Sequence, residues 1–161
     1  MNQWRQSLNQ LRLTTLRKIK EDIAFHEGNI PYIYLDHLGY KTLGIGHLIR
    51  QSEPEYIQEV GTPVSEEVIN KRFDDDLDTA IRDAERIFGP LNEHPQDVIR
   101  VLVNMSFNLG YPRLNGFVKM KEAVAQKNYL RAADEMKDSK WYTQVGRRGP
   151  ELFKLMSEAD L

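Results

Sequence analysis

The spacing of apolar residues predicts helical structure near the N-terminus of the chain. From Trp4 to Ile23 these residues recur at the spacing of one helix face. The pattern fits one long helix or two helices broken near Thr14–Thr15. Gly28 is a usual helix-ending residue, because glycine adopts the left-handed conformation without strain. We therefore expect Glu27 in the last helical turn.

The pattern becomes β-like between residues 32 and 49. The runs YIYL (32–35) and YKTLGIGHLI (40–49) are rich in β-branched and aromatic residues, and a short turn at residues 37–39 separates them. They predict a small hairpin or a three-stranded meander. Residues 51–61 are polar and irregular, so we expect a loop there.

A long amphipathic helix is predicted over residues 65–88. Ser65 can cap its first turn, and Glu66 and Glu67 follow at positions where negative charge is favourable. Apolar residues recur along one face of the whole segment, and Gly89–Pro90 ends it. The helix is long enough to connect two lobes.

The rest of the chain is predicted to be helical. Residues 95–109 have little polar face, as in a buried helix. Shorter helices are expected at about 115–126, 129–138 and 147–158, with residues 140–142 between them. The sum is an α+β fold with a small N-terminal β-sheet lobe, a connecting helix and a helical C-terminal lobe. A cleft between the lobes is the expected place for a site.

The length of the chain fits one domain over residues 1–161. Within it we expect an N-terminal extension (1–15), a β lobe (about 28–62), the connecting helix (about 65–88) and the helical lobe (about 90–161).

Composition excludes several classes of function. The 22 basic and 24 acidic residues are interspersed and give a net charge of −2, so no basic surface for nucleic acid is expected. There is no cysteine, which excludes disulfides and thiol catalysis. The four histidines lack metal-ligand spacing, and we expect neither a metal nor another cofactor. No apolar run has transmembrane or signal-peptide character, so we expect no membrane insertion.

Two carboxyl groups and one hydroxyl are the candidate chemistry. Glu27 has apolar sequence neighbours, which favour a protonated carboxyl that can act as a general acid. Asp36 lies in a polar turn that favours its ionised form. Thr42 begins the next strand, where its hydroxyl can help to hold a water molecule. A proton donor and an ionised carboxylate are the pair that glycosidic bond cleavage requires.

A purely structural interpretation of the same residues is also open. Glutamate at helix ends and aspartate in hairpin turns are common. On this interpretation the tyrosines between residues 32 and 40 are ordinary strand residues, and Gly44 and Gly46 only relieve crowding in the strand.

Three groups of motifs indicate a family. H-E-G (26–28) is followed by an aspartate nine residues after the glutamate, and then by G-Y-x-T-x-G-I-G-H (39–47). LVNMSFNLG (102–110), NGF (115–117) and SKWYTQVGRR (139–148) follow in order. The sequence resembles the phage-type lysozymes, the glycoside hydrolase family 24 endolysins. The resemblance implies a lysozyme-like fold with an active-site cleft between the two lobes.

The resemblance implies catalytic roles for three residues. Glu27 matches the general acid. Asp36 matches the carboxylate that positions and activates the attacking water, and Thr42 matches its partner in holding that water. Arg148 matches an arginine that approaches the catalytic glutamate, and there it would oppose the effect of the apolar neighbours.

Other residues match supporting and substrate-binding positions. His47 and Asp76 match a structural ion pair between the sheet and the long helix, although Asp76 also fits a solvated acidic run. Phe107 and Met120 also fit core positions, and Trp141 and Tyr142 are expected mainly to pack. The residues that match the lining of the sugar cleft are Leu48, Phe107, Met120 and Glu135.

The implied function is that of a muramidase. It would hydrolyse the β-1,4 bond between N-acetylmuramic acid and N-acetylglucosamine in bacterial peptidoglycan, with inversion, to lyse the host cell of a phage. One alternative is a lytic transglycosylase on the same substrate, which needs one acid; Asp36 and Thr42 argue against it. Another is a non-catalytic peptidoglycan-binding virion module, against which the presence of Glu27 with both of these residues argues.

The resemblance also bears on partners and place of action. We expect a monomer, made in the host cytoplasm without a signal peptide. It would act on the cell wall after release through a membrane hole, or as a component of the virion. The extension (1–15) would add a helical turn over the core or dock on another protein. The isoelectric point of about 6.1 predicts weak electrostatic attraction to an anionic wall.

Overall fold

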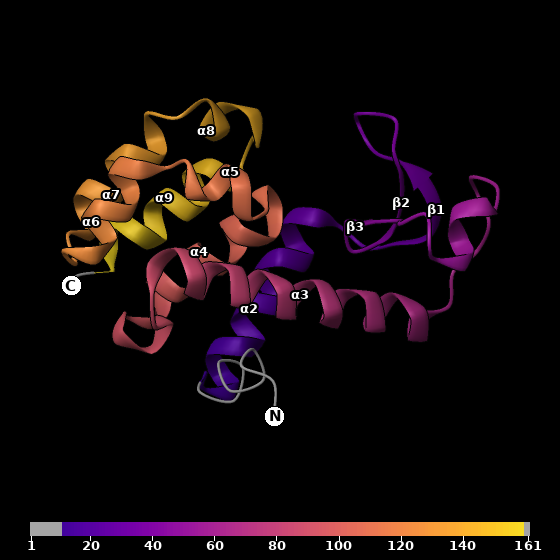
Figure 1. Cartoon of the computed structure of the whole chain (residues 1–161), viewed down its shortest axis with the longest axis horizontal. Helices are drawn as coiled ribbons and strands as arrows, with labels where there is room; N and C mark the ends of the chain where they lie inside the picture. Colours follow the sequence, from indigo (N-terminus) through magenta and orange to yellow (C-terminus); the bar gives the residue numbers. More distant parts are fainter. Residues whose placement is uncertain (1–10, 160–161) are drawn as a thin grey trace. The chain divides into compact units, whose positions relative to one another are not determined.

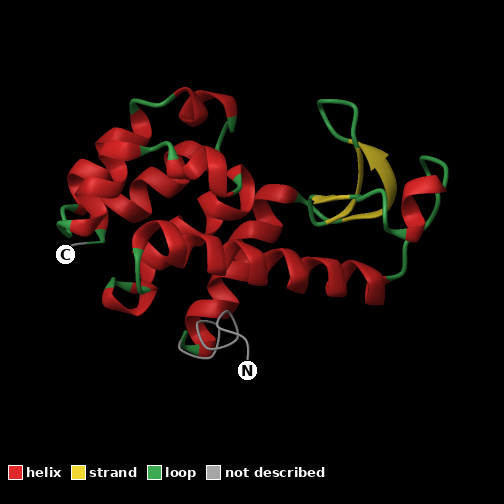
Figure 2. Ribbon diagram, in the orientation of Figure 1, coloured by secondary structure: helices red, strands yellow, loops and turns green. Residues whose placement is uncertain are grey.

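A computed structural model of the chain describes residues 11–159. Helices make up most of this part, and the strands are confined to residues 30–48 (Figures 1 and 2). The described residues group into two compact units. The β unit is Glu21–Leu77, and the helical unit holds the described residues before Glu21 and after Leu77. The fold is α+β, as the sequence predicted.

The first described helix, α2, spans Leu13–Glu27. It begins at Leu13, and Leu11 and Arg12 before it are not helical, so the alternative of one continuous helix from Trp4 was wrong; the residues before Leu11 lie outside the described residues. Ile23 is fully buried. Gly28 follows with φ +79° and donates its N–H to the carbonyl of Ala24 at 2.9 Å, which ends the helix directly after Glu27.

The sheet is an antiparallel meander in the order β1 (Ile30–Leu35), β2 (Lys41–Gly44) and β3 (His47–Leu48). This is one of the two predicted arrangements. On its core side Ile33 and Leu43 are fully buried. The register pairs Tyr34 with Thr42 and Thr42 with Leu48.

The segment after the sheet is more ordered than the predicted loop. It contains a short 3₁₀ helix, η1 (Pro54–Ile57). The Nζ atom of Lys41 donates to the carbonyls of Tyr56 (2.9 Å) and Gln58 (2.6 Å) and thereby ties this segment to β2. These bonds join residues far apart in the sequence, which is why spacing alone did not reveal the order.

Helix α3 spans Glu66–Phe88, in agreement with the predicted connecting helix. Ser65 caps it, because its Oγ atom accepts the N–H of Val68 at 3.2 Å. Ile69 lies against Gly44, where an added Cβ would be 2.6 Å from its Cγ2 atom. Glycine at this position therefore allows α3 to approach β2 closely.

The helical unit is built around α4 (Gln96–Leu109), which follows the 3₁₀ helix η2 (Leu91–Glu93). α4 contacts α9 (Arg148–Glu158), and α7 (Tyr129–Lys137) packs against α9 and α6 (Val118–Ala125). The α4 residues that are fully buried are Val98, Val101, Leu102, Val103, Asn104 and Met105.

Two segments of this unit are more helical than predicted. The helix expected at about 115–126 is α6, and a further short helix, α5 (Tyr111–Asn115), precedes it. Pro112 lies in the first turn of α5, where proline is tolerated because its missing N–H has no intrahelical partner. Residues 140–142 belong to a helix, α8 (Lys140–Gln144), whose N-cap Ser139 accepts the N–H of Tyr142 at 3.3 Å.

Candidate functional site

Glu27 lies at the exit of α2, half-buried, where the backbone turns toward the sheet. Its carboxyl group packs against Gly46. A Cβ atom added at Gly46 would be 2.5 Å from Oε1 and 3.0 Å from Cδ of Glu27. Gly46 also has φ +63°, which favours glycine. The second glycine of the G-I-G run thus makes room for the carboxyl of Glu27.

Asp36 is held by the turn between β1 and β2. Its Oδ1 atom accepts two backbone N–H groups, from Leu38 and Tyr40, each at 2.9 Å. Its own N–H donates to the carbonyl of Tyr40, and Gly39 donates to the carbonyl of Asp36, both at 2.9 Å. These bonds fix the orientation of the carboxylate. Among the hydrogen bonds of residues 11–159, none uses Oδ2, which leaves it available for water.

The register brings Thr42 and Leu48 to the same side of the sheet as Tyr34. Residues directly opposite each other in antiparallel strands share a face, and Thr42 is opposite both Tyr34 and Leu48. Asp36 follows Tyr34 by two residues. Thr42 is buried and its Oγ1 atom donates to the carbonyl of Tyr40 at 2.9 Å, which leaves its lone pairs to accept a hydrogen bond.

Tyr34 connects the two predicted acids electrostatically. Its side chain is half-buried. Burial raises the pKa of its hydroxyl, and the negative charges of Glu27 and Asp36 raise it further. Both carboxyl groups therefore lie within electrostatic range of one phenol. Sequence reasoning missed this residue, although its position two residues before Asp36 was a signal.

His47 and Asp76 form the contact that the resemblance implied. His47 Nδ1 lies 2.7 Å from Asp76 Oδ2, so Asp76 is not merely a member of a solvated acidic run. The other ring nitrogen, Nε2, lies 2.8 Å from Oε1 of Glu53. Glu53 in turn contacts Arg72 Nε at 2.7 Å, and Arg72 Nη2 lies 3.1 Å from Glu55. We call these five residues the His47 network.

The network sets the charge state of His47, which is almost fully buried. Burial alone would lower the pKa of His47. The hydrogen bonds and charges of Asp76 and Glu53 outweigh burial, so the pKa is raised above its ordinary value. Glu53, Glu55 and Arg72 were not identified from sequence, because only the fold brings residues 53–55 next to α3.

Leu48 lines a cavity of the β unit. The cavity has a volume of about 550 Å³ and includes the exposed rings of Tyr40 and Tyr56. Volumes of this size accommodate small ligands. Of the four predicted substrate-binding residues, Leu48 is the one that lies in this unit, near the turn that holds Asp36.

The other predicted residues lie in the helical unit. Met120 and Glu135 line one cavity of about 410 Å³, although Met120 is also 1% exposed and so belongs to the core. Phe107 is half-buried on α4 and does not line that cavity. Arg148 is buried, and its Nε atom donates to Asn104 Oδ1 at 2.9 Å. Its predicted effect on Glu27 stays a prediction.

Trp141 packs as predicted. It is 3% exposed, donates from Nε1 to Asn108 Oδ1 at 2.8 Å and meets the Phe117 ring edge-on. Tyr142 is half-buried and makes a similar edge contact with Phe153.

Two absences concern the described residues only. Within residues 11–159, no three side chains of His, Asp or Glu are grouped so that they could hold a metal ion. In the same part of the chain, no helix has the length and apolar character needed to cross a membrane.

The α+β fold, with one small three-stranded antiparallel sheet among helices, is consistent with a lysozyme-like fold. The phage lysozyme family matches residues 24–155, and the chain belongs to this family.

Individual relatives agree with this family. The chain is 27% identical to a protein named probable T4-type lysozyme 2 from Dictyostelium discoideum, over 89% of this chain and 95% of the relative. It is 25% identical to probable T4-type lysozyme 1 of the same organism, with the same coverage. It is 27% identical to peptidoglycan hydrolase gp36 of Pseudomonas phage phiKMV, over 86% of this chain and 15% of that longer protein.

Proposed function

We propose that the protein is a muramidase that hydrolyses the β-1,4 bond between N-acetylmuramic acid and N-acetylglucosamine in bacterial peptidoglycan. Membership of the phage lysozyme family supports a lysozyme, and the phiKMV relative is named a peptidoglycan hydrolase. One observation carries the proposed mechanism. The carboxyl groups of Glu27 and Asp36 both lie within electrostatic range of Tyr34, as expected if they belong to one site.

In the proposed reaction Glu27 is the general acid. It gives its proton to the glycosidic oxygen as the bond to the anomeric carbon breaks, so the leaving sugar departs as an alcohol. The half-buried position of Glu27 against Gly46 supports this role, because it limits the positions that the carboxyl can take.

Asp36 and Thr42 hold the attacking water in this proposal. Oδ1 of Asp36 is occupied by two backbone N–H groups, so Oδ2 accepts the proton of the water as it attacks the anomeric carbon. The hydroxyl of Thr42 accepts a second hydrogen bond from that water. The reaction consumes one water, leaves Glu27 ionised and Asp36 protonated, and exchange with solvent restores both. Acid–base chemistry of this kind requires no cofactor, and one copy of the chain is sufficient.

Attack by a bound water predicts inversion at the anomeric carbon. Inverting enzymes need room for that water, so we expect the two carboxyl groups to be roughly 6.5–9.5 Å apart in the working enzyme. Leu48 and its cavity would contact the sugar chain from the β unit. Phe107, Met120 and Glu135 stay predicted substrate-binding residues of the helical unit.

Analysis of the products tests the bond and the reaction. Purified peptidoglycan is digested with the wild type, and the released fragments are analysed by mass spectrometry and, immediately after cleavage, by proton NMR. We expect fragments with N-acetylmuramic acid at the reducing end, heavier by one water than anhydro products, and first seen as the α anomer. Anhydro-sugar ends would indicate a transglycosylase, and binding without cleavage would indicate a non-catalytic module.

We further propose that this activity lyses the host cell of a phage. The relative from phage phiKMV supports this assignment. The test is expression inside bacteria, followed by permeabilisation of the inner membrane with chloroform. We expect turbidity to fall rapidly only after permeabilisation. Rapid lysis without permeabilisation would contradict release through a membrane hole, and no lysis in either case would contradict the lytic role.

A further inference from the structure

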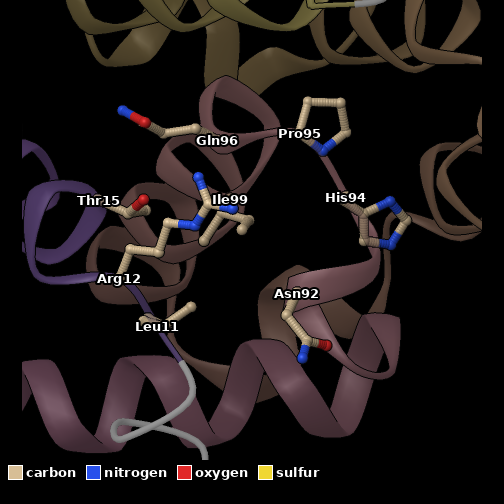
Figure 3. Close-up of a pocket in the computed structure, with 8 residues that line it drawn as sticks. All are labelled: Leu11, Arg12, Thr15, Asn92, His94, Pro95, Gln96 and Ile99. Atoms are coloured by element: carbon tan, nitrogen blue, oxygen red, sulfur yellow. The ribbon is translucent and has the colours of Figure 1, made fainter.

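The helical unit contains a second cavity, which the proposed reaction does not use. Its volume is about 480 Å³, and Figure 3 shows the side chains around it. They come from the start of α2, from η2 and from the start of α4. None of the predicted site residues lines it. The lining residues are Leu11, Arg12, Thr15, Asn92, His94, Pro95, Gln96 and Ile99.

Two features make this cavity electropositive. Arg12 is exposed at its edge, and among residues 11–159 its guanidinium has no ion pair. The N-cap of α4 is Pro95, which has no side chain to accept a hydrogen bond from the first turn. The first N–H groups of this 14-residue helix therefore lack a side-chain cap, and a helix N-terminus favours an anion.

Thr15 is the independent observation that points to a ligand. It is only 3% exposed, yet it lines the cavity. Its hydroxyl makes no hydrogen bond to any other described residue. Among the described residues the hydroxyl is therefore left to bond an oxygen-bearing ligand that enters the cavity. Figure 3 shows Thr15 on the same side of the cavity as Arg12, with the amide of Gln96 extended toward that side.

Nearby acidic groups do not neutralise this charge. Asp97, in the first turn of α4, pairs with Arg100 Nη1 at 3.0 Å. Glu93 is exposed and acts on His94, while the cation Lys127 acts on the same ring with opposite sign.

Apolar side chains also line the cavity. Leu11 and Ile99 are both buried and line it together with Pro95. On the far wall His94 is fixed by a 2.7 Å hydrogen bond between its Nδ1 and the hydroxyl of Tyr129. A small ligand with a charged head and an apolar body matches this mixed lining.

We propose that this cavity binds a small organic oxyanion. Its phosphate or carboxylate head would bind Arg12, Thr15 and the uncapped N–H groups of α4, and its apolar body would contact Leu11 and Ile99. The cavity is large enough for such a ligand but larger than an inorganic ion needs. The proposal does not depend on the muramidase function.

Calorimetric titration of the full chain tests the site. Phenyl phosphate and benzoate are the two anionic probes, and phenol, with the same ring and no charge, is the control. We expect saturable binding of at least one anion, with a Kd of about 1 mM or tighter, and none of phenol. Phenyl phosphate favoured over benzoate would identify a phosphate site, and the reverse a carboxylate site. No saturable binding of either anion up to about 10 mM overturns the proposal.

Variants locate the binding. Arg12→Gln should raise the Kd of the anion about tenfold or more, because it removes a charge-assisted hydrogen bond. Thr15→Val keeps the volume of the side chain but removes the hydroxyl, and it should raise the Kd of the anion about threefold to tenfold. The control is Lys18→Gln, an equal loss of charge at an exposed position of the same helix, which should leave binding unchanged.

Equal affinity in Arg12→Gln and the wild type would place the anion elsewhere and overturn the assignment. Backbone amide NMR shifts give a second readout, in which residues 96–99 should move on titration. Glu27→Gln should bind the probes as the wild type does. The proposal of anion binding can therefore be contradicted without contradicting the proposal of peptidoglycan hydrolysis, and the reverse also holds.

Discussion

Gly46 is predicted to position the carboxyl of Glu27. Gly46→Ala would put a methyl group 2.5 Å from Oε1, and the flexible carboxyl, rather than backbone, would have to move. Misplacement of a reacting group by about 1 Å can cost about 100-fold in rate. We expect Gly46→Ala to lower kcat for peptidoglycan hydrolysis about tenfold to 100-fold, measured as the release of reducing ends.

The control for this substitution is Gly61→Ala. Gly61 has φ +93° in the same unit, but a Cβ there would meet nothing within 4 Å. Both substitutions force alanine into the left-handed region, which costs about 1–2 kcal/mol. Their unfolding free energies should therefore fall by similar amounts, while kcat falls only in Gly46→Ala. Equal kcat values for the two variants would show that Gly46 does not position Glu27.

At the scale of residues, the sequence predicted some contacts and not others. The family motif over residues 26–47 identified Glu27, Asp36 and Thr42 as candidates, and the polar residues after Asp36 predicted a turn there. The place of Gly46 beside Glu27 could not be predicted, because it depends on the positive φ of Gly46 and on how the strand bends. The link through Tyr34 depends on the strand register, which the sequence did not specify.

At the scale of elements, the His47 network joins β3, the segment around η1 and α3. His47 comes from the sheet, Glu53 from the segment before η1, and Asp76 and Arg72 from α3. Asp76→Asn removes one charged partner of a buried ring while Glu53 remains. We expect a loss of about 2 kcal/mol in the free energy of unfolding, below the usual cost of breaking a buried pair.

The pH dependence of the stability lost in Asp76→Asn follows from the shifted pKa values of His47 and Glu53. The pKa of His47 is raised, so its contribution is complete below its ordinary value of 6.5 and is lost as pH rises through the raised pKa. Burial alone would raise the pKa of Glu53, but the Arg50 N–H and the charges of His47 and Arg72 outweigh it and lower the pKa. Its contribution is complete above 4.5 and is lost as pH falls through the lowered pKa.

Urea unfolding across this range checks the prediction. The difference between wild type and Asp76→Asn should be largest between pH 4.5 and 6.5 and should shrink in alkaline solution. The neighbouring substitution Asp75→Asn is the control. Asp75 forms an exposed pair with Lys71 at 3.3 Å, so its loss should cost less than about 0.5 kcal/mol at any pH. A difference that grows with rising pH would contradict the assignment.

The elements themselves were largely predictable. The amphipathic period, the Ser65 cap and Gly89–Pro90 fixed α3 almost to the residue. The short helix α5 was not, because a proline can end one helix or begin the next, and its neighbours do not decide which. The order of the segment around η1 depends on the long-range bonds of Lys41.

At the scale of the whole molecule, charge is expected to contribute little to wall binding. The net charge is −2, so attraction to an anionic polymer is weak and salt has little attraction to screen. We expect the rate of peptidoglycan hydrolysis to change less than about threefold between about 20 and about 200 mM NaCl. A steep fall with salt, absent for an uncharged oligosaccharide substrate, would indicate a local basic surface that steers the enzyme.

The fold class was predictable from the change of period along the chain together with the family motifs. The grouping of the chain into two units was not, since it divides α2 and α3 within continuous helices. The electropositive cavity was also invisible to sequence reasoning. Its lining joins residues 11–15 with residues 92–99, and no motif connects these segments.

The central claim is that Glu27 and Asp36 act as one acid–base pair, and the release of reducing ends from purified peptidoglycan tests it most directly. Glu27→Gln and Asp36→Asn are compared with the wild type and with Glu67→Gln, an exposed control on α3, after circular dichroism has shown that each is folded. We predict that the rate of each site variant falls about 100-fold to 10,000-fold, while the control keeps full activity. Wild-type release by either Glu27→Gln or Asp36→Asn would contradict the account.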